Sequence, residues 1–114
     1  MKITVTTGVR IAADYPDRYI ARSFAALAPD VEIDPEQVWT AGNRVDSLAG
    51  DLASDRCATQ WQKDLRRELD IAEAPSVSVG DIVVLHTDAG VYLGGWRCAS
   101  CGWDVLDAEP VAGP

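Results

Sequence analysis

The feature that most constrains this chain of 114 residues is a strand–turn–strand pattern in its C-terminal third. Gly80-Asp81 precede a β-branched run, Ile82–Val84, and Asp88–Gly90 separate it from a second run, Val91–Leu93. Two such runs joined by a short segment containing Asp and Gly are typical of a β-hairpin. Trp103–Leu106 follow with a pattern that suits a third strand, so we expect an antiparallel meander here.

The rest of the chain predicts one strand and two or three helices. Lys2–Thr7 alternates apolar and polar residues, which indicates a strand that ends at Gly8. Apolar spacings of three and four predict a helix over Pro16–Leu27. Asp34 and Pro35 resemble an N-cap followed by the first helical residue, and Ser54–Ile71 is the strongest helical segment.

These elements predict an α+β fold, in which a small antiparallel sheet is packed by two or three helices. The sheet consists of the N-terminal strand plus the C-terminal hairpin or meander. The helix over Ser54–Ile71 carries an apolar stripe of Ala58, Trp61, Leu65 and Leu69. That stripe suits either the sheet or a second copy of the chain, so a homodimer stays open. We expect one domain over residues 1–109, followed by a flexible tail over 110–114.

The charge of the chain disfavours several classes of partner. Eighteen acidic residues against ten basic ones give a formal net charge of −8. Such a chain repels phosphate backbones and anionic lipid surfaces, so we expect no direct nucleic-acid binding and no membrane association. A third hypothesis is a small nucleic-acid-binding β-barrel, because strand entries like Ser78–Asp81 (SVGD) also occur in such barrels. The negative charge of the chain argues against it. An acidic face would instead attract a basic surface on another protein.

The three cysteines raise the question of zinc. Cys98 and Cys101 are separated by two residues and followed by Gly102, as in half of a zinc knuckle. The other half would have to come from Cys57 or His86, which match no standard second knuckle. We therefore expect no cofactor, with zinc as the alternative.

We expect no enzymatic activity, because the familiar catalytic patterns are missing from the sequence. It contains no phosphate-binding loop, dinucleotide-binding glycine pattern, nucleophile elbow or HExxH helix. His86 is the only histidine and has no recognisable partner for acid–base work.

Several short segments resemble one class of proteins. Val38-Trp39, residues 43–46, the Ser76–Asp81 segment and Gly102-Trp103 together look like small accessory proteins encoded by actinobacterial phages and mobile elements. The resemblance covers about the latter two thirds of the chain. It implies a non-structural protein that acts in the cytoplasm of a bacterial host and has no catalytic residue to carry over.

We therefore expect a protein that binds and modulates a host protein, in its sharpest form as an inhibitor of a defence or nucleic-acid-handling factor. The alternative is a zinc-stabilised regulatory binding domain built on the Cys98/Cys101 knuckle. Apolar anchors within a charged rim are typical of protein interfaces. The interface candidates are Trp39, Trp96, Trp103, Asp104 and Asp107.

Overall fold

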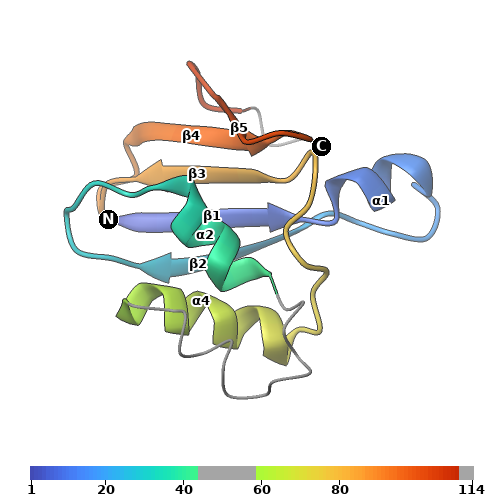
Figure 1. Ribbon diagram of the computed structural model, residues 1–114, viewed down its shortest axis with the longest axis horizontal. Helices are drawn as coiled ribbons and strands as arrows, with labels where there is room; N and C mark the ends of the chain where they lie inside the picture. The colour runs from blue at the N-terminus through green and yellow to red at the C-terminus, as the bar shows by residue number, and fades with distance from the viewer. Residues whose placement is uncertain (44–58, 111–114) are drawn as a thin grey trace.

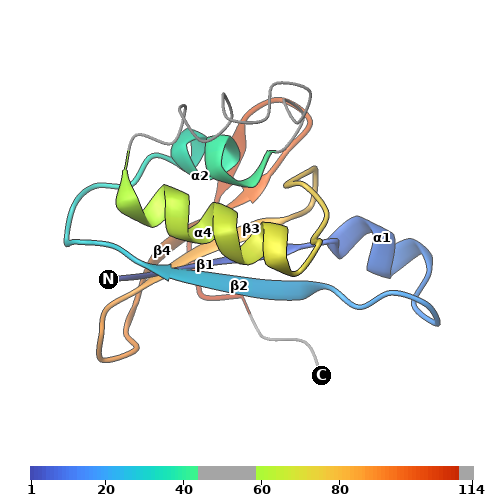
Figure 2. The same cartoon turned by 90° about the horizontal axis from the view of Figure 1, so that it is seen from below.

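A five-stranded antiparallel sheet with helices on one face forms the body of the protein (Figures 1 and 2). The computed structural model describes residues 1–43 and 59–110. The α+β class predicted from the sequence is confirmed. In sheet order, the strands are β2 (Arg22–Leu27), β1 (Lys2–Thr7), β3 (Ile82–His86), β4 (Tyr92–Cys98) and β5 (Trp103–Val105).

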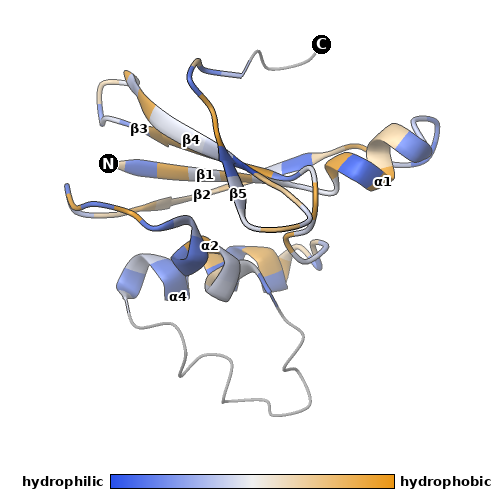
Figure 3. Cartoon of the chain, turned by 45° about the horizontal axis from the view of Figure 1, so that its top comes forward, coloured by the Kyte–Doolittle hydropathy of each residue, from blue (hydrophilic) through white to orange (hydrophobic). Residues whose placement is uncertain are grey.

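The central strand β1 divides its side chains between the two faces of the sheet, as its alternating pattern predicts. Ile3 and Val5 are fully buried on the helix-covered face, whereas Thr4 and Thr6 lie on the opposite, open face. The alternation is visible as bands along β1 in Figure 3. β1 pairs with β2 on one side and β3 on the other, so it joins the two ends of the chain in one sheet.

The helix predicted over Pro16–Leu27 is wrong, because this segment contains a turn followed by strand β2. The register places Phe24 opposite Val5 and Ala26 opposite Ile3, so alternate residues of β2 face the core. An apolar spacing of three or four residues can also arise within an alternating strand of small residues. Pairing with β1 decides between the two patterns, because as a strand the segment packs Phe24 and Ala26 on the core beside Val5 and Ile3.

Two helices cover one face of the sheet: α2 (Pro35–Gly42) and α4 (Gln60–Ile71). The predicted start of α2 is confirmed, since the Asp34 side chain accepts a hydrogen bond from the Glu36 backbone N–H. α4 begins after Thr59, whose hydroxyl accepts from the Gln62 backbone N–H. The first part of the predicted Ser54–Ile71 helix lies outside the described residues.

The apolar stripe of α4 packs on the sheet, not on a second copy. Trp61 is only 2% exposed, and Leu65 and Leu69 are fully buried in the core cluster. Burial of one such side chain stabilises the fold by about 2 kcal/mol. Ala58, the fourth predicted member, lies outside the described residues. This stripe therefore forms part of the core.

Polar contacts fix α2 against α4. The Gln62 side-chain amide donates to the Gln37 carbonyl at 2.9 Å, and the Arg66 guanidinium donates to the Asn43 carbonyl at 3.1 Å. Gln62 is itself buried, so its amide satisfies a carbonyl that water reaches poorly. These two contacts hold α2 in place beside β4 and β5, where the candidate site is found.

A short helix, α1 (Val9–Asp14), was not predicted from the sequence. It follows Gly8, whose φ of +76° turns the chain out of β1, and it buries none of its residues. Together with the turn before β2, α1 extends beyond one end of the sheet (Figure 1). Among the helices that the structure describes, none is both long and apolar enough to cross a bilayer.

Candidate interaction surface

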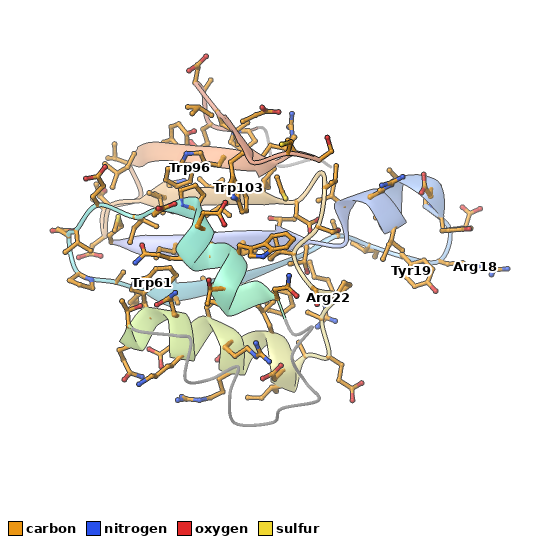
Figure 4. The ribbon with its side chains drawn as sticks, in the orientation of Figure 1. Arg18, Tyr19, Arg22, Trp61, Trp96 and Trp103 are labelled. Carbon is orange, nitrogen blue, oxygen red and sulfur yellow. The ribbon has the colours of Figure 1, made fainter. Side chains whose placement is uncertain are left out.

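Three of the four tryptophans gather where α2 meets β4 and β5. Trp39, Trp96 and Trp103 are each half-buried and pack against the edge of the core cluster. The register pairs Cys98 with Trp103 and Trp96 with Val105, which places Trp96 and Trp103 on the same face of the β4–β5 hairpin. Figure 4 shows both side chains near α2. The fold thus joins tryptophans that lie up to 64 residues apart in the sequence.

Carboxylates of the α2 N-terminus lie beside these indoles. The Trp103 indole N–H donates to a carboxylate oxygen of Glu36 at 3.2 Å, a contact that joins β5 to α2. Asp34, the N-cap of α2, lines the same groove as Trp96. We call the five residues Trp39, Trp96, Trp103, Asp34 and Glu36 the tryptophan–acid surface.

Two hollows open on the tryptophan–acid surface. One has a volume of about 220 Å³ and is lined by Glu36, Trp39, Cys98 and Trp103, among others. The other is a shallow groove of about 520 Å³ beside Trp96, with Glu32 and Asp34 on its walls. Each hollow therefore combines an indole with at least one carboxylate, and both are open to solvent.

The two predicted acidic interface residues do not join the tryptophans. Asp104 pairs with Arg97 in the β4–β5 register, so it lies on the opposite face of the hairpin from Trp103. Asp107 is exposed beyond the end of β5, where its charge and that of Glu109 help to raise the pKa of Tyr92, after burial as the main cause. The acidic component comes instead from Asp34 and Glu36. In the sequence, these two residues belong to an alternating acidic run, Asp30–Glu36, which by itself indicates a solvated loop. Only the tertiary structure shows that part of this run lies beside the tryptophans.

The buried carboxylate of Asp81 stabilises the turn before β3 through hydrogen bonds to the backbone. Asp81 is fully buried, and its two oxygens accept hydrogen bonds from the backbone N–H groups of Val9 and Ser78 at 3.1 and 2.9 Å. Burial raises the pKa of Asp81, while the backbone donors, including Gly8, oppose that rise. The Asp81 backbone carbonyl also accepts from Cys98 at 2.8 Å, so the SVGD turn positions the end of β4. The Asp81 side chain therefore caps the turn that precedes β3.

The two cysteines of the CxxC segment differ in environment. Cys98 is the last residue of β4, and Cys101 lies in the β4–β5 turn, which is closed by a hydrogen bond from Ala99 N–H to the Gly102 carbonyl and has Gly102 at a φ of +80°. Cys98 is buried and Cys101 is exposed. Burial raises the pKa of the Cys98 thiol, and the charges of Asp81 and Glu36 raise it further.

His86 does not lie near the CxxC turn. The register pairs Ile82 with Arg97, next to Cys98, and His86 lies four residues further along β3, about 13 Å away. His86 instead lies on the open face of the sheet and contacts the Glu109 carboxylate at 2.6 Å. Over residues 1–43 and 59–110, no three Cys, His, Asp or Glu side chains converge as a metal site would require. Cys57, the other candidate ligand, lies outside the described residues.

Comparison with known proteins adds no assignment. No protein-family model, no curated protein and no solved structure matches this chain.

Proposed function

We propose that this is a non-enzymatic accessory protein of a phage or mobile element that binds a basic segment of a host protein at the tryptophan–acid surface. The observation that carries the proposal is the Trp103–Glu36 contact, which holds a carboxylate beside an indole at the mouth of a hollow. The resemblance to actinobacterial phage and mobile-element proteins supports this origin.

The chemistry of the surface fits an arginine or lysine side chain. A cation over the face of a tryptophan is attracted by the ring quadrupole, and a neighbouring carboxylate adds a charge-assisted hydrogen bond. The tryptophan–acid surface offers both groups within one hollow. Its aliphatic and aromatic walls also suit the methylene stem of a long basic side chain.

The surface is pre-organised, which favours binding because fewer groups must be ordered when the partner arrives. Asp34 is fixed by its N-cap hydrogen bond, Glu36 is held by Trp103, and the three indoles rest on the core. A host protein that handles nucleic acid carries basic residues on its binding surface. Occupation of those residues by this acidic protein would exclude the nucleic acid and so inhibit the host factor.

The test is a pull-down from actinobacterial lysate with three variants beside the wild type. The double variant D34N/E36Q removes both charges while Asn at position 34 keeps the N-cap. W103F removes the indole N–H and part of the ring. D104N is the matched control, because it removes an acidic charge from the opposite face of the same hairpin.

We expect a partner that elutes at moderate salt, is captured by wild type and D104N, and is lost with D34N/E36Q and weakened with W103F. Titration of each protein with an arginine-rich peptide, followed by tryptophan fluorescence, should give the same order. Equal capture by D34N/E36Q and the wild type would contradict the proposal. Loss of capture with D104N would move the binding surface to the other face.

A further inference from the structure

The outer edge of β2 carries regularly spaced backbone groups that lack partners in the described structure. Ala28 N–H donates to the Met1 carbonyl at 2.8 Å, and the Met1 amino group donates to the Ala28 carbonyl at 3.0 Å. Met1 and Ala28 therefore form a hydrogen-bonded pair of an antiparallel ladder. Along such a ladder, hydrogen-bonded pairs alternate with pairs that are not hydrogen-bonded to each other. The register therefore directs the backbone groups of Arg22, Phe24 and Ala26 toward β1.

The intervening residues Ser23, Ala25 and Leu27 direct their N–H and C=O groups away from β1, toward the free edge. Within residues 1–43 and 59–110, no backbone hydrogen bond to these three residues is formed from the outer side. β2 is the outermost strand of the sheet at this edge, and α4 lies on the helix-covered side of it and extends past the strand (Figures 1 and 2). The interior of the strand contains no proline and no charge, which are two of the devices by which proteins block an exposed edge.

We propose that two copies of this chain pair through β2, antiparallel and in register about a two-fold axis at Ala25, to form one continuous ten-stranded sheet. In this register Ala25 lies opposite Ala25 of the second copy, and Ser23 lies opposite Leu27. The outward N–H and C=O groups of all three residues then find partners, which gives about six intermolecular hydrogen bonds.

The side chains of β2 suit this pairing with its own copy. Leu27 is 73% exposed on the open face, and the proposed register covers it with Ser23 and Ala25 of the second copy. Ala25 is small, so the two copies meet at the axis without a clash. On the helix-covered face, Phe24 lies opposite Ala26 of the second copy, which extends the apolar layer across the junction.

Charge also favours a second copy over the basic partner of the tryptophan–acid surface. Arg22, a cation at the start of β2, is held by its hydrogen bond to the Ala72 carbonyl and lies over the Phe24 ring (Figure 4). A basic strand would meet Arg22 directly. In the self-paired register Arg22 lies opposite Ala28, so the two Arg22 residues are separated by about 20 Å along the junction.

The experiment measures mass in solution by sedimentation and light scattering for wild type, A25K, A25E and an equimolar mixture of the two variants. Ala25 is exposed and its side chain does not enter the core, so both variants should fold. We expect a wild-type dimer of twice 12.3 kDa. Like charges directly opposite on paired strands repel, so each variant alone should be monomeric and the mixture should recover the dimer.

Two results would overturn the proposal: a wild-type monomer at the highest soluble concentration, or a dimer that A25K and A25E leave unchanged. Amide hydrogen exchange provides a measurement that needs no variant. In a self-paired protein the Ala25 amide is protected and its protection rises with concentration, whereas a free edge exchanges rapidly at all concentrations. Because each copy carries a charge of −8, added salt should tighten the dimer, opposite to its effect on a basic partner.

Discussion

At the scale of single residues, Asp81 links three distant parts of the chain. Its buried carboxylate holds the start of α1, the turn before β3 and, through its backbone, the end of β4. A hydrogen bond within a protein contributes about 0.5–1.5 kcal/mol, and a buried N–H left unsatisfied costs about 1–3 kcal/mol. Asp81 therefore matters more to the fold than an exposed aspartate does.

We predict that D81N lowers the free energy of unfolding by about 1–3 kcal/mol, because one of its two backbone donors would face an amide N–H₂ instead of an oxygen. Urea denaturation measures the loss. The control D104N changes an exposed aspartate and should alter stability by less than about 0.5 kcal/mol. Equal stability of D81N and the wild type would mean that this carboxylate does not hold the turn.

The difference in free energy of unfolding between the wild type and D81N should depend on pH. The pKa of Asp81 is raised in the native state, so the native protein binds this proton more tightly than the unfolded chain does. The contribution of Asp81 is complete below its unfolded pKa of about 4 and falls as pH rises through the native pKa. The stability of the wild type relative to D81N should therefore decrease from acid toward neutral pH, as measured by urea denaturation across that range.

Gly42 is a second residue with a specific requirement. A Cβ atom at this position would lie 2.3 Å from a methyl carbon of Val77, which is buried in the core. Replacement of glycine by alanine in a helix usually stabilises it by about 1 kcal/mol, but overpacking costs about 1–3 kcal/mol. We predict that G42A is destabilised and that V77A in the same chain recovers part of the loss. Additive losses in a double-mutant cycle would contradict the predicted clash.

At the scale of elements, the two helices that cover the sheet each begin with a capping box. In α4 the Thr59 hydroxyl accepts from the Gln62 backbone N–H, and the Gln62 side chain accepts from the Thr59 backbone N–H. The same Gln62 side chain reaches α2, so this cap also supports the contact between the helices.

We predict that T59A lowers the free energy of unfolding by about 1 kcal/mol, whereas T59S, which keeps the hydroxyl, stays within a few tenths of the wild type. Thermal and urea denaturation both measure this. A loss of the same size in T59S would show that the methyl group, and not the cap, is responsible.

At the scale of the whole molecule, the net charge and the positions of the tryptophans together determine how charged quenchers affect the tryptophan fluorescence. The chain carries −8, and three of its four tryptophans lie at the surface near carboxylates while Trp61 is buried. An acidic surface concentrates cations and repels anions within about a Debye length.

We predict that caesium quenches the tryptophan fluorescence more strongly than iodide at low salt, when the quenching by each ion is divided by its quenching of a free, neutral tryptophan analogue, and that a fraction from Trp61 resists both ions. In D34N/E36Q the difference between the two ions should shrink. Equal normalised quenching by both ions in the wild type would show that the indoles do not lie in a negative potential. This measurement requires no partner, so it tests the surface separately from the proposed function.

The elements that depend on residues close together in the sequence could be predicted from the sequence. The β3–β4 hairpin and the start of α2 at Asp34-Pro35 both depend on contacts between residues a few positions apart. Such contacts leave signatures in spacing and residue type, because caps and turns need particular side chains and backbone angles.

Strand β2 and the site could not be predicted in this way. Pro16–Leu27 fits a helical spacing by itself, and only the unpaired side of β1 makes Arg22–Leu27 a strand. The site forms because the β4–β5 register sends Trp96 and Trp103 to one face and Asp104 to the other, while α2 brings Glu36 alongside.

The sequence by itself thus determined the fold class, the hairpin, the cap of α2 and the negative charge of this protein. Only the tertiary structure decided which segment completes the sheet, which acidic residues meet the tryptophans and which strand edge stays open. The physical reason is the separation along the sequence of the residues that interact. Caps, turns and net charge depend on neighbours along the chain or on composition alone, whereas strand pairing and face assignment depend on hydrogen bonds and core contacts between distant segments.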